Sequence, residues 1–442
     1  MDIPFFPHLY QTNEQEIELR ELLLRLIACS LDICLSLDCL NDLQHVLQYE
    51  YCIINSYVYG DQSYHMWRNV GNVISSTMAL GYHEDLSTKY KIPTFLLELR
   101  KAAFARVHSL DKNSSLFLGR PLRLSKRFCH FQLPDSRLPL DCQSPLLDEL
   151  GLYQWDPESV MNYRAETRWS ALCAFIKEDA IELLFDSNRS DCRQTVEALQ
   201  KMADTQWNSL PAHFRLQDGI RNHSNSPFQR DFMASIRLNH LHVSFLLRRL
   251  GWDRLSEPNA PLIEVTTEML KLVVELVMLR EELSNSGTNL SWKIAHYGLP
   301  GAGIILLAML NPHSTPSCLR TTRSSVLQDL TVLTMEIEKG TVAKAGDANY
   351  ALLTKATQTI HLFLAFTLSD KTATQLSIVP QLSEEVQNAG SWEQQLGQDF
   401  LESELSFWDS MADHPSLFSH GLLTEDEGLD GSSISVIVAQ EP

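Results

Sequence analysis

Helical periodicity runs through most of residues 14–368 and limits the possible folds more than any other feature of this sequence. Apolar residues recur at intervals of three and four positions, which places them along one face of an α-helix. No segment shows a convincing alternation of apolar and polar residues, the pattern of a half-buried β-strand. The sequence therefore predicts an all-α fold, built as one large multi-helix domain.

Glycine and proline residues mark where the expected helices stop and start. Gly60, Gly81 and Gly251 each follow an apolar-periodic stretch, Asn41 is placed to cap a helix, and Pro93 opens one. The expected helices span residues 14–39, 43–59, 67–78, 93–118, 164–184, 193–210, 232–250, 261–285, 292–310, 323–339 and 350–368. The first of them is leucine-rich and is expected to be mostly buried, as one helix or two. The stripe of the fourth is Leu96, Leu99, Phe104, Val107 and Leu110, and the proline-rich residues 119–155 are expected to form a long loop.

The charge of the chain opposes direct contact with nucleic acid. Its 36 basic and 55 acidic residues give a formal net charge of −19 over 442 residues. A duplex-binding module normally carries the opposite sign, because phosphate contacts need Lys and Arg. Any contact with DNA is therefore expected to be indirect.

Nine cysteines are spread irregularly along the chain, which fits reduced thiols in the cytosol or nucleus. Cys29, Cys34 and Cys39 are the closest group, but a step of five residues turns a helix by ~500°, so these thiols do not share a face. No Cys-x-x-Cys pair occurs. We expect buried core cysteines rather than zinc ligands, and no cofactor held by this chain.

No signal peptide or membrane span is apparent in the sequence. The start, Met1-Asp2-Ile3-Pro4, lacks a basic region followed by an apolar core, and the longest apolar run covers only residues 304–310. A soluble, intracellular protein with no membrane partner is expected.

The C-terminal residues 381–442 differ in character from residues 1–380. They contain five Asp and eight Glu but no Lys or Arg, so like charge opposes compaction and favours disorder. Large apolar side chains are interleaved with the acids: Trp392, Phe400, Leu401, Leu405, Phe407 and Trp408. Several of these would line one face of a helix formed on docking, which is typical of an acidic activation segment. The alternative is a passive solubilising tail.

An ordered series of short motifs lies between residues 66 and 134. It consists of Trp67, Gly81-Tyr82-His83, Arg100-Lys101, Phe104-Ala105, Leu110-Asp111, Leu118-Gly119-Arg120-Pro121 and Leu133-Pro134. The series resembles the regulatory (middle homology) domain of fungal zinc-cluster transcription factors, which typically reads as an aromatic-led helix, Gly-Leu-His, a basic pair before Phe-Trp, Leu-Asp and Leu-Gly-Arg-Pro. Residues 296–303 resemble a second landmark of that family. The resemblance spans roughly residues 43–368, and residues 43–134 are its most specific part.

The sequence departs from the family pattern in several places. Ala105 stands where the family usually has Trp, Ala102 where a third basic residue often lies, and Glu84 where Arg is common. The family's DNA-reading module, six cysteines in two closely spaced sets with basic residues between them, is not found before Leu43. Zinc is therefore expected only in a cluster upstream of this sequence.

The resemblance implies a nuclear transcription regulator, shuttling with the cytoplasm in some members, that controls a metabolic or secondary-metabolite gene set. It implies activation through the acidic tail, contact with the transcription machinery or co-regulators, and a response to a small-molecule effector. DNA contact would come from a missing N-terminal zinc cluster, an upstream partner or a zinc-bearing dimer mate. The partners that the resemblance suggests are a second copy of the chain, as a homodimer, or a zinc-cluster protein. The alternative is a stand-alone small-molecule sensor or adaptor of this family that has no DNA binding of its own.

Each family motif also has a purely structural interpretation. Arg120 could contact an anionic effector, but a helix cap at Gly119-Arg120-Pro121 with an ion pair to Asp111 is favoured. His83 is expected to be a satisfied structural histidine, because no metal-ligand spacing surrounds it.

Other candidate motifs are weaker. Gly298, Gly301 and Gly303 are expected to allow close helix packing rather than phosphate binding, and His240 and His242 point to different faces of a helix. No hydrolase, kinase, zinc-protease or P-loop signature is present, so an enzyme is not predicted.

Overall fold

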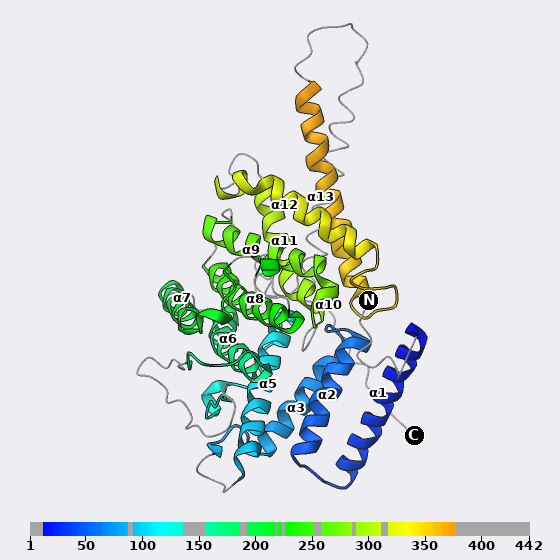
Figure 1. Ribbon diagram of the computed structural model, residues 1–442, viewed down its shortest axis with the longest axis vertical. Helices are drawn as coiled ribbons and strands as arrows, with labels where there is room; N and C mark the ends of the chain where they lie inside the picture. The colour runs from blue at the N-terminus through cyan, green and yellow to red at the C-terminus, as the bar shows by residue number, and fades with distance from the viewer. Residues whose placement is uncertain are drawn as a thin grey trace, which may run out of the picture.

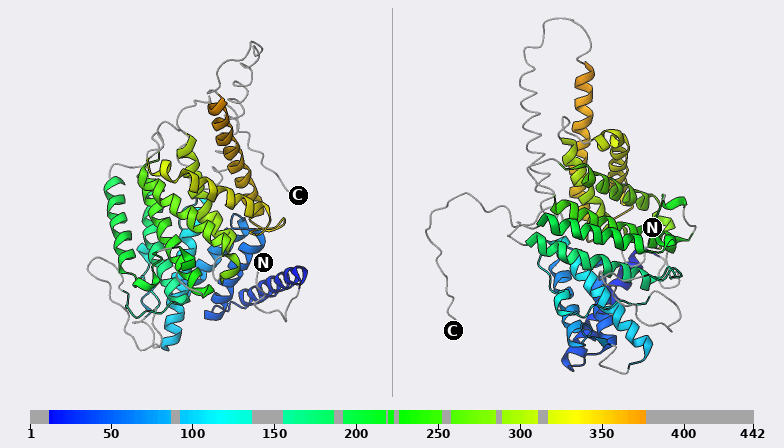
Figure 2. Two further views of the ribbon diagram at one scale, coloured as in Figure 1. Left: turned by 45° about the horizontal axis from the view of Figure 1, so that its top comes forward. Right: turned by 90° about the vertical axis from the view of Figure 1, so that its left-hand side faces the viewer.

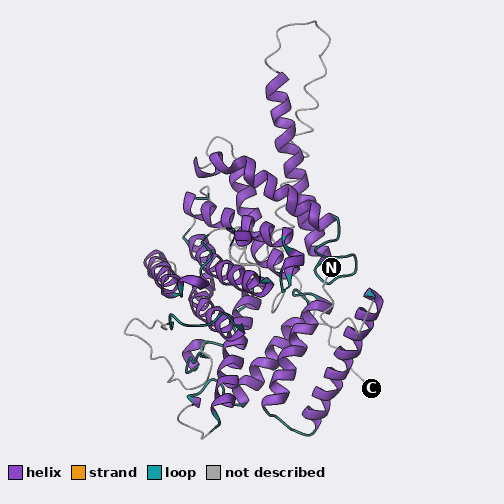
Figure 3. Cartoon of the chain, viewed as in Figure 1, coloured by secondary structure: helices purple, strands orange, loops and turns teal. Residues whose placement is uncertain are grey.

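The computed structural model describes residues 12–86, 92–135, 155–185, 192–217, 219–222, 226–251, 258–284, 289–310 and 317–376. Within these residues the secondary structure is helical and contains no strand, as Figure 3 shows. The predicted all-α fold is therefore confirmed. The segment 381–442, with all of the candidate activation residues, lies outside the described residues.

The described helices occur in the predicted order, but α9 ends seven residues before its predicted end, α12 begins six residues early and α13 extends eight residues further. The α-helices are α1 (Asn13–Ser36), α2 (Asp42–Tyr59), α3 (Tyr64–Ala79), α5 (Thr94–Leu118), α6 (Tyr163–Phe185), α7 (Cys192–Ser209), α8 (Pro227–Leu250), α9 (Ala260–Met278), α10 (Leu290–Lys293), α11 (Leu299–Leu310), α12 (Ser317–Glu338) and α13 (Tyr350–Leu376). Short 3-10 helices are η1 (Lys126–Phe128), η2 (Ala212–Phe214), η3 (Ile220–Asn222) and η4 (Arg280–Glu282), and η5 (Ile294–Gly298) is a π-helix.

The helix ends use the local signals that the sequence contains. The Asn41 side chain accepts a hydrogen bond from the Gln44 N–H at 3.0 Å and so caps α2, as predicted. Gly119 ends α5 in the left-handed conformation with φ +59°, which a residue with a side chain rarely adopts. These caps explain why the predicted start of α2 and the predicted end of α5 agree with the observed ones.

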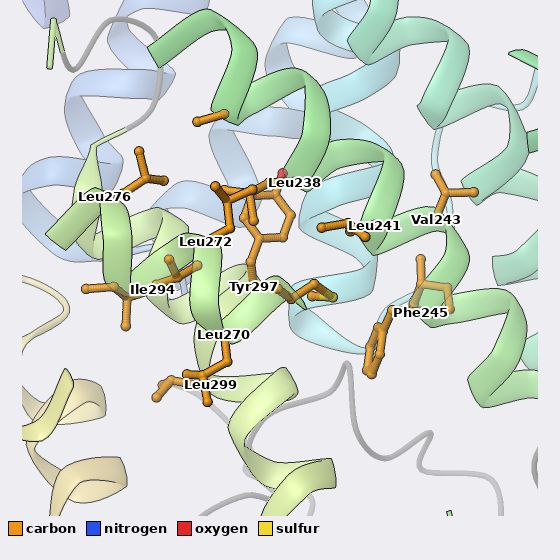
Figure 4. Close-up of a cluster of buried hydrophobic side chains, with 14 of the residues drawn as sticks. Leu238, Leu241, Val243, Phe245, Leu270, Leu272, Leu276, Ile294, Tyr297 and Leu299 are labelled. Atoms are coloured by element: carbon orange, nitrogen blue, oxygen red, sulfur yellow. The ribbon is translucent and has the colours of Figure 1, made fainter. Parts of the chain in front are cut away.

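The main core forms where α8 packs between α6 and α9, and η5 and α11 also pack on α9. Figure 4 shows Leu238 and Leu241 of α8, Leu272 of α9 and Tyr297 of η5 gathered in one buried cluster. Close approach of α11 to α9 depends on glycine: a Cβ at Gly301 would lie 3.1 Å from the Thr266 carbonyl oxygen. The predicted use of these glycines for close helix packing is confirmed for Gly298 and Gly301.

A second, smaller core joins α2, α3 and α5. Its buried members are Cys52, Met66, Val70, Val73, Ile74, Tyr82, Phe104, Val107 and Leu124. At its edge, Arg100 donates two hydrogen bonds to the Asp42 carboxylate, at 2.7 and 2.9 Å, and the hydrogen bonds with Arg100 lower the pKa of Asp42. Leu99, predicted to be part of the buried stripe of α5, is instead exposed. The buried positions beside it are the ion-paired Glu98 and Lys101, whose charged atoms lie 3.0 Å apart.

Helix α1 lies at the edge of the molecule next to α2, as Figures 1 and 2 show. The prediction that residues 14–39 are mostly buried is wrong, because α1 contacts the rest of the molecule mainly through one face on α2. The expectation of buried core thiols fails here too: Cys29 and Cys39 are exposed, and Cys34 is half-buried. The sequence pattern showed that α1 is apolar, but it could not show that no described helix covers the outer side of α1.

Helix α13 begins against α12 and extends beyond the body of the molecule (Figure 1). None of the described helices is both long enough and apolar enough to cross a membrane.

Candidate functional site

A cavity of about 520 Å³ lies inside the domain, bounded by α2, α5, α6, α8 and the α10–η5 segment. This volume falls within the range of sites that hold small molecules. Its walls combine aromatic rings with hydroxyl and amide groups, among them Tyr49, Trp169, Ser109, Asn113 and Asn239. The cavity therefore suits a ligand that has both a flat apolar part and groups that form hydrogen bonds.

A stack of three rings forms one wall. The His296 ring lies between Phe117 and Trp292, with centroid distances of 4.1 and 4.0 Å and interplanar angles of 18° and 22°. Phe117 comes from α5, whereas His296 and Trp292 come from the α10–η5 segment. The stack thus holds together two sides of the cavity that are far apart in sequence, and all three of its rings contribute to the cavity wall.

The π-helix η5 explains how so many side chains of one short segment reach the cavity. Leu299 N–H donates to the Ile294 carbonyl, a bond across five residues, and the wider turn brings residues four and five apart closer to one face. Pro300, two residues after η5, has no N–H to donate to the His296 carbonyl, so the α-helical pattern is interrupted at this point. Trp292, Lys293, His296 and Tyr297 consequently all line the cavity.

An acidic side chain, Glu166 of α6, lies in the cavity wall near a buried ion pair. Lys293 pairs with Asp231, and both side chains are almost completely buried. Burial, followed by the charge of Asp231, raises the pKa of Glu166 to about 7, although the charge of Lys293 acts in the opposite direction. Glu166 is therefore partly protonated at neutral pH and can both donate and accept a hydrogen bond within the cavity.

Arg106 of α5 is the remaining cation of the cavity wall, and it is exposed. Its charge acts on Glu166 and lowers the pKa of that carboxyl, but Arg106 is in none of the close ion pairs of the described residues. Its guanidinium is thus available to a carboxylate or phosphate group of a ligand at this side of the cavity.

The cavity wall is linked to the start of α13. Asp61, which lines the cavity after α2, accepts a hydrogen bond from Asn349 Nδ2 at 3.0 Å, and Asn349 immediately precedes α13. Burial raises the pKa of Asp61 to about 6, and the hydrogen bond with Asn349 opposes that shift. The adjoining backbone also fits closely, because a Cβ at Gly60 would lie 3.0 Å from the Ala348 carbonyl oxygen. A displacement of Asp61 in the cavity wall would therefore displace Asn349 and the start of α13.

A separate cluster of four fully buried polar residues joins α5 to α6. Lys112 Nζ lies 3.0 Å from Asp111 and 3.1 Å from Glu178, and His108 Nε2 lies 3.1 Å from the same Glu178 oxygen. The carboxylates also bind the chain that follows α5: Asp111 accepts from the Leu124 N–H at 3.1 Å. The cluster holds residues 122–126 against the two helices and has the geometry of a structural device.

Titration of this cluster follows from its burial. Burial, with the nearby Lys112 charge, lowers the pKa of His108 to about 4, so the ring is neutral at pH 7 and donates to Glu178. For Glu178, burial alone would raise the pKa, but the hydrogen bond from His108 and the charge of Lys112 outweigh it and lower the pKa to about 2. Glu178 is therefore ionised in the native state over the whole neutral range.

The predicted ion pair between Arg120 and Asp111 is not formed. Asp111 is occupied by Lys112 and by backbone N–H groups, and the Arg120 guanidinium instead lies 5.0 Å from the centre of the Trp67 ring. Arg123 lies 3.6 Å from the same ring, so Trp67 receives two cations. Two landmarks of the predicted family core, Trp67 and Arg120, are thus brought into contact with each other.

The other predicted family-core residues have local roles around the smaller core. His83 accepts a backbone hydrogen bond from His130 at 2.7 Å, while its buried Nδ1 has no partner among the described residues. Pro134 accepts from Arg168 Nη1 at 3.0 Å and Pro121 from the Ser115 hydroxyl at 3.4 Å. The ten core residues are Trp67, Gly81, His83, Arg100, Phe104, Asp111, Gly119, Arg120, Pro121 and Pro134, and the cavity lining includes none of them.

The cavity residues themselves were missed by sequence reasoning, except that His296 and Tyr297 begin the second family landmark. Glu166, Trp292 and Lys293 carry no motif, because the five segments that surround the cavity are separated by long stretches of chain. Pro300, close after an aromatic pair, is the single local signal that could have drawn attention to η5.

No known protein family, curated protein or solved structure matches this chain. Among the described residues, no three His, Cys, Asp or Glu side chains come together as they would around a metal ion.

Proposed function

We propose that this chain is a ligand-responsive transcription regulator, in which the helical domain binds a small molecule and residues 381–442 act on the transcription machinery. The observation that carries the proposal is the cavity of about 520 Å³, which lies between helices, is partly open to solvent and is lined by both rings and polar groups. The resemblance to the fungal regulatory domain adds the role in transcription, and the −19 net charge supports indirect contact with DNA.

The proposed signal passes from the cavity to α13 through the Asp61–Asn349 contact. A ligand that binds beside Asp61 favours one position of this contact, and α13 leads directly in sequence to the acidic segment. Ligand binding shifts activity only to the extent that the ligand prefers one of two positions of this link. Asn349→Ala is therefore expected to leave ligand affinity within a few-fold while uncoupling the response.

A direct test of binding is a thermal-shift screen of the purified full chain against cellular metabolites. A bound compound stabilises the folded chain and so raises the unfolding temperature. At a ligand concentration one hundred times its Kd, the free energy of unfolding increases by about 2.7 kcal/mol. Ser170→Phe, which places a ring in the cavity, is expected to abolish the shift. The matched control Ser75→Phe lies on an exposed face of α3 and should keep it.

A reporter assay tests the regulatory part separately. The chain is fused to a foreign DNA-binding domain, with and without alanine at Phe400, Leu401, Leu405 and Trp408. Activation that is lost in the alanine variant supports the regulator. Ligand binding with a silent reporter would instead favour the alternative, a sensor or adaptor that modulates other proteins. No binding by any compound, with Ser170→Phe indistinguishable from the native chain in every assay, would refute a role for the cavity.

A further inference from the structure

Helix α1 (Asn13–Ser36) has apolar side chains on two opposite faces. One face, which includes Leu24, Ile27 and Leu31, is half-buried against α2. The other is exposed to solvent, with exposed fractions of 51% for Leu22, 54% for Leu26 and 58% for Ile33. Cys29 is exposed between them. An apolar face of this length on the outside of a folded domain is a mark of an interaction surface.

The outer residues form a regular seam. Leu22, Leu26, Cys29 and Ile33 follow one another at steps of four, three and four residues, the spacing of the contact positions in a two-helix coiled coil. Ile33 of the seam lies nine residues after Leu24 of the face that packs on α2. Nine steps of ~100° make two and a half turns, so the seam and that face are on opposite sides of the helix. The seam is therefore shaped to receive one further helix.

Two helices that this protein could supply are a helix formed by residues 381–442 and the α1 of a second copy, and charge favours the second copy. Helix α1 has five acidic and two basic residues, a net charge of −3, and residues 381–442 have thirteen acidic and no basic residues. Repulsion therefore opposes docking of the acidic segment on α1. Two copies of α1 carry only −3 each, so their mutual repulsion is weaker, and unlike the acidic segment a second α1 also brings basic residues that can face the acids of the first.

The register of a two-fold pair follows from the seam. In an antiparallel pair, Leu22 packs on the partner's Ile33 and Leu26 on the partner's Cys29. Arg25 and Asp32 flank the seam on the same side, and this register brings Arg25 next to the partner's Asp32, twice by symmetry. In a parallel pair Arg25 would instead face the partner's Ser30. Within one chain, Arg25 pairs only with Glu21 at 3.3 Å across an exposed turn, a contact that is readily exchanged.

We infer that the protein forms a homodimer through antiparallel pairing of α1 with the α1 of a second copy, along the seam Leu22–Leu26–Cys29–Ile33. Helix α1 is the outermost described helix on its side of the molecule, so a second body can approach it (Figures 1 and 2). The helix is already held by the domain, which removes most of the ordering cost that an isolated helix would meet on pairing. The inference is independent of what the cavity binds.

Analytical ultracentrifugation of the full chain over a range of concentrations tests the pairing. The native chain is expected to reach twice its mass of 50.3 kDa, whereas Leu26→Glu and Ile33→Glu stay at 50.3 kDa. The matched control Phe95→Glu, at a side chain 63% exposed on α5, keeps the dimer. Circular dichroism is expected to be unchanged in all three variants, because none of these side chains is buried. A native chain that remains monomeric at every concentration overturns the inference.

A charge swap tests the register. Arg25→Asp and Asp32→Arg each place like charges together twice, so each is expected to raise the dimer Kd by about tenfold or more. The double variant restores opposite charges and is expected to return the Kd to within about threefold of the native value. A dimer that Leu26→Glu breaks but that neither single charge change weakens would overturn the antiparallel register. The dimer would also be overturned if the native chain is a monomer and Leu26→Glu makes residues 381–442 cleavable by protease. That result would show that the seam binds this acidic segment.

Discussion

Glu166 should make the protein less stable as the pH rises, and Glu166→Gln should remove this effect. The unfolded chain releases the proton of this carboxyl near pH 4.5, whereas the folded chain holds it until about pH 7. Between these values the native state binds more protons than the unfolded state, so the free energy of unfolding falls as pH increases. Glutamine keeps nearly the same shape but cannot ionise, so the variant does not show this fall.

The expected size follows from the pKa difference. A shift from 4.5 to about 7 corresponds, at 1.36 kcal/mol per pH unit, to on the order of 3 kcal/mol once the pH exceeds 7. The cavity beside Glu166 has room for water, and water there would solvate the ionised carboxylate, so this figure is the upper end of the range. At pH 4.5 the native chain and the variant are expected to differ by little, because the native carboxyl is protonated in the folded state and still about half protonated in the unfolded state.

Urea unfolding at several pH values between 4.5 and 8 measures the effect. The quantity to follow is the free energy of unfolding of Glu166→Gln minus that of the native chain, in which all other titrations cancel. This difference should become more positive as the pH rises, because the native chain loses stability and the variant does not. Glu264→Gln, at an exposed position of α9, serves as the control and should show no such rise. A difference that is constant over this pH range would show that the native carboxyl is not held protonated, and the account of the cavity wall given above would be wrong.

Three further predictions concern the buried parts of the fold. Lys112→Met leaves two fully buried carboxylates without their cation and should lower the free energy of unfolding by about 3 to 5 kcal/mol, measured by urea denaturation. The native chain should lose stability as the pH falls from 6.5 to about 4, because the unfolded state protonates His108 and the native state does not; His108→Gln should reduce that slope. Gly301→Ala should cost about 1 to 3 kcal/mol through its 3.1 Å contact, whereas Gly251→Ala, with no contact under 3.8 Å, should be nearly neutral in thermal unfolding.

The helices could be predicted from the sequence because their ends carry local signals. Asn41 caps α2 with its own side chain, and Gly119 supplies the left-handed residue after α5. Such signals act within a few residues, so neighbouring sequence is enough to locate them. The burial of α1 could not be predicted in this way, because an apolar residue indicates a preference for contact and not whether the same chain supplies a partner.

The cavity could not be predicted because no short segment contains it. Glu166, Asn239 and Lys293 each come from a different helix, and each is an ordinary polar residue in its own sequence context. Their common surroundings arise only when α6, α8 and η5 pack together. The π-helix adds to the difficulty, because a period of 3.6 residues assigns His296 and Tyr297 to more widely separated directions than the structure gives them.

The buried charges between α5 and α6 have a consequence for how the chain folds. Glu178 and Asp111 lose water when the helices dock, and the backbone N–H groups that replace this water belong to residues 123–126. Docking without that segment in place would leave two carboxylates with a single cation, so the intermediate would be high in free energy. Collapse of the two helices and closure of the chain after Gly119 should therefore occur in one kinetic step, and a refolding experiment should detect no species that has completed only one of them.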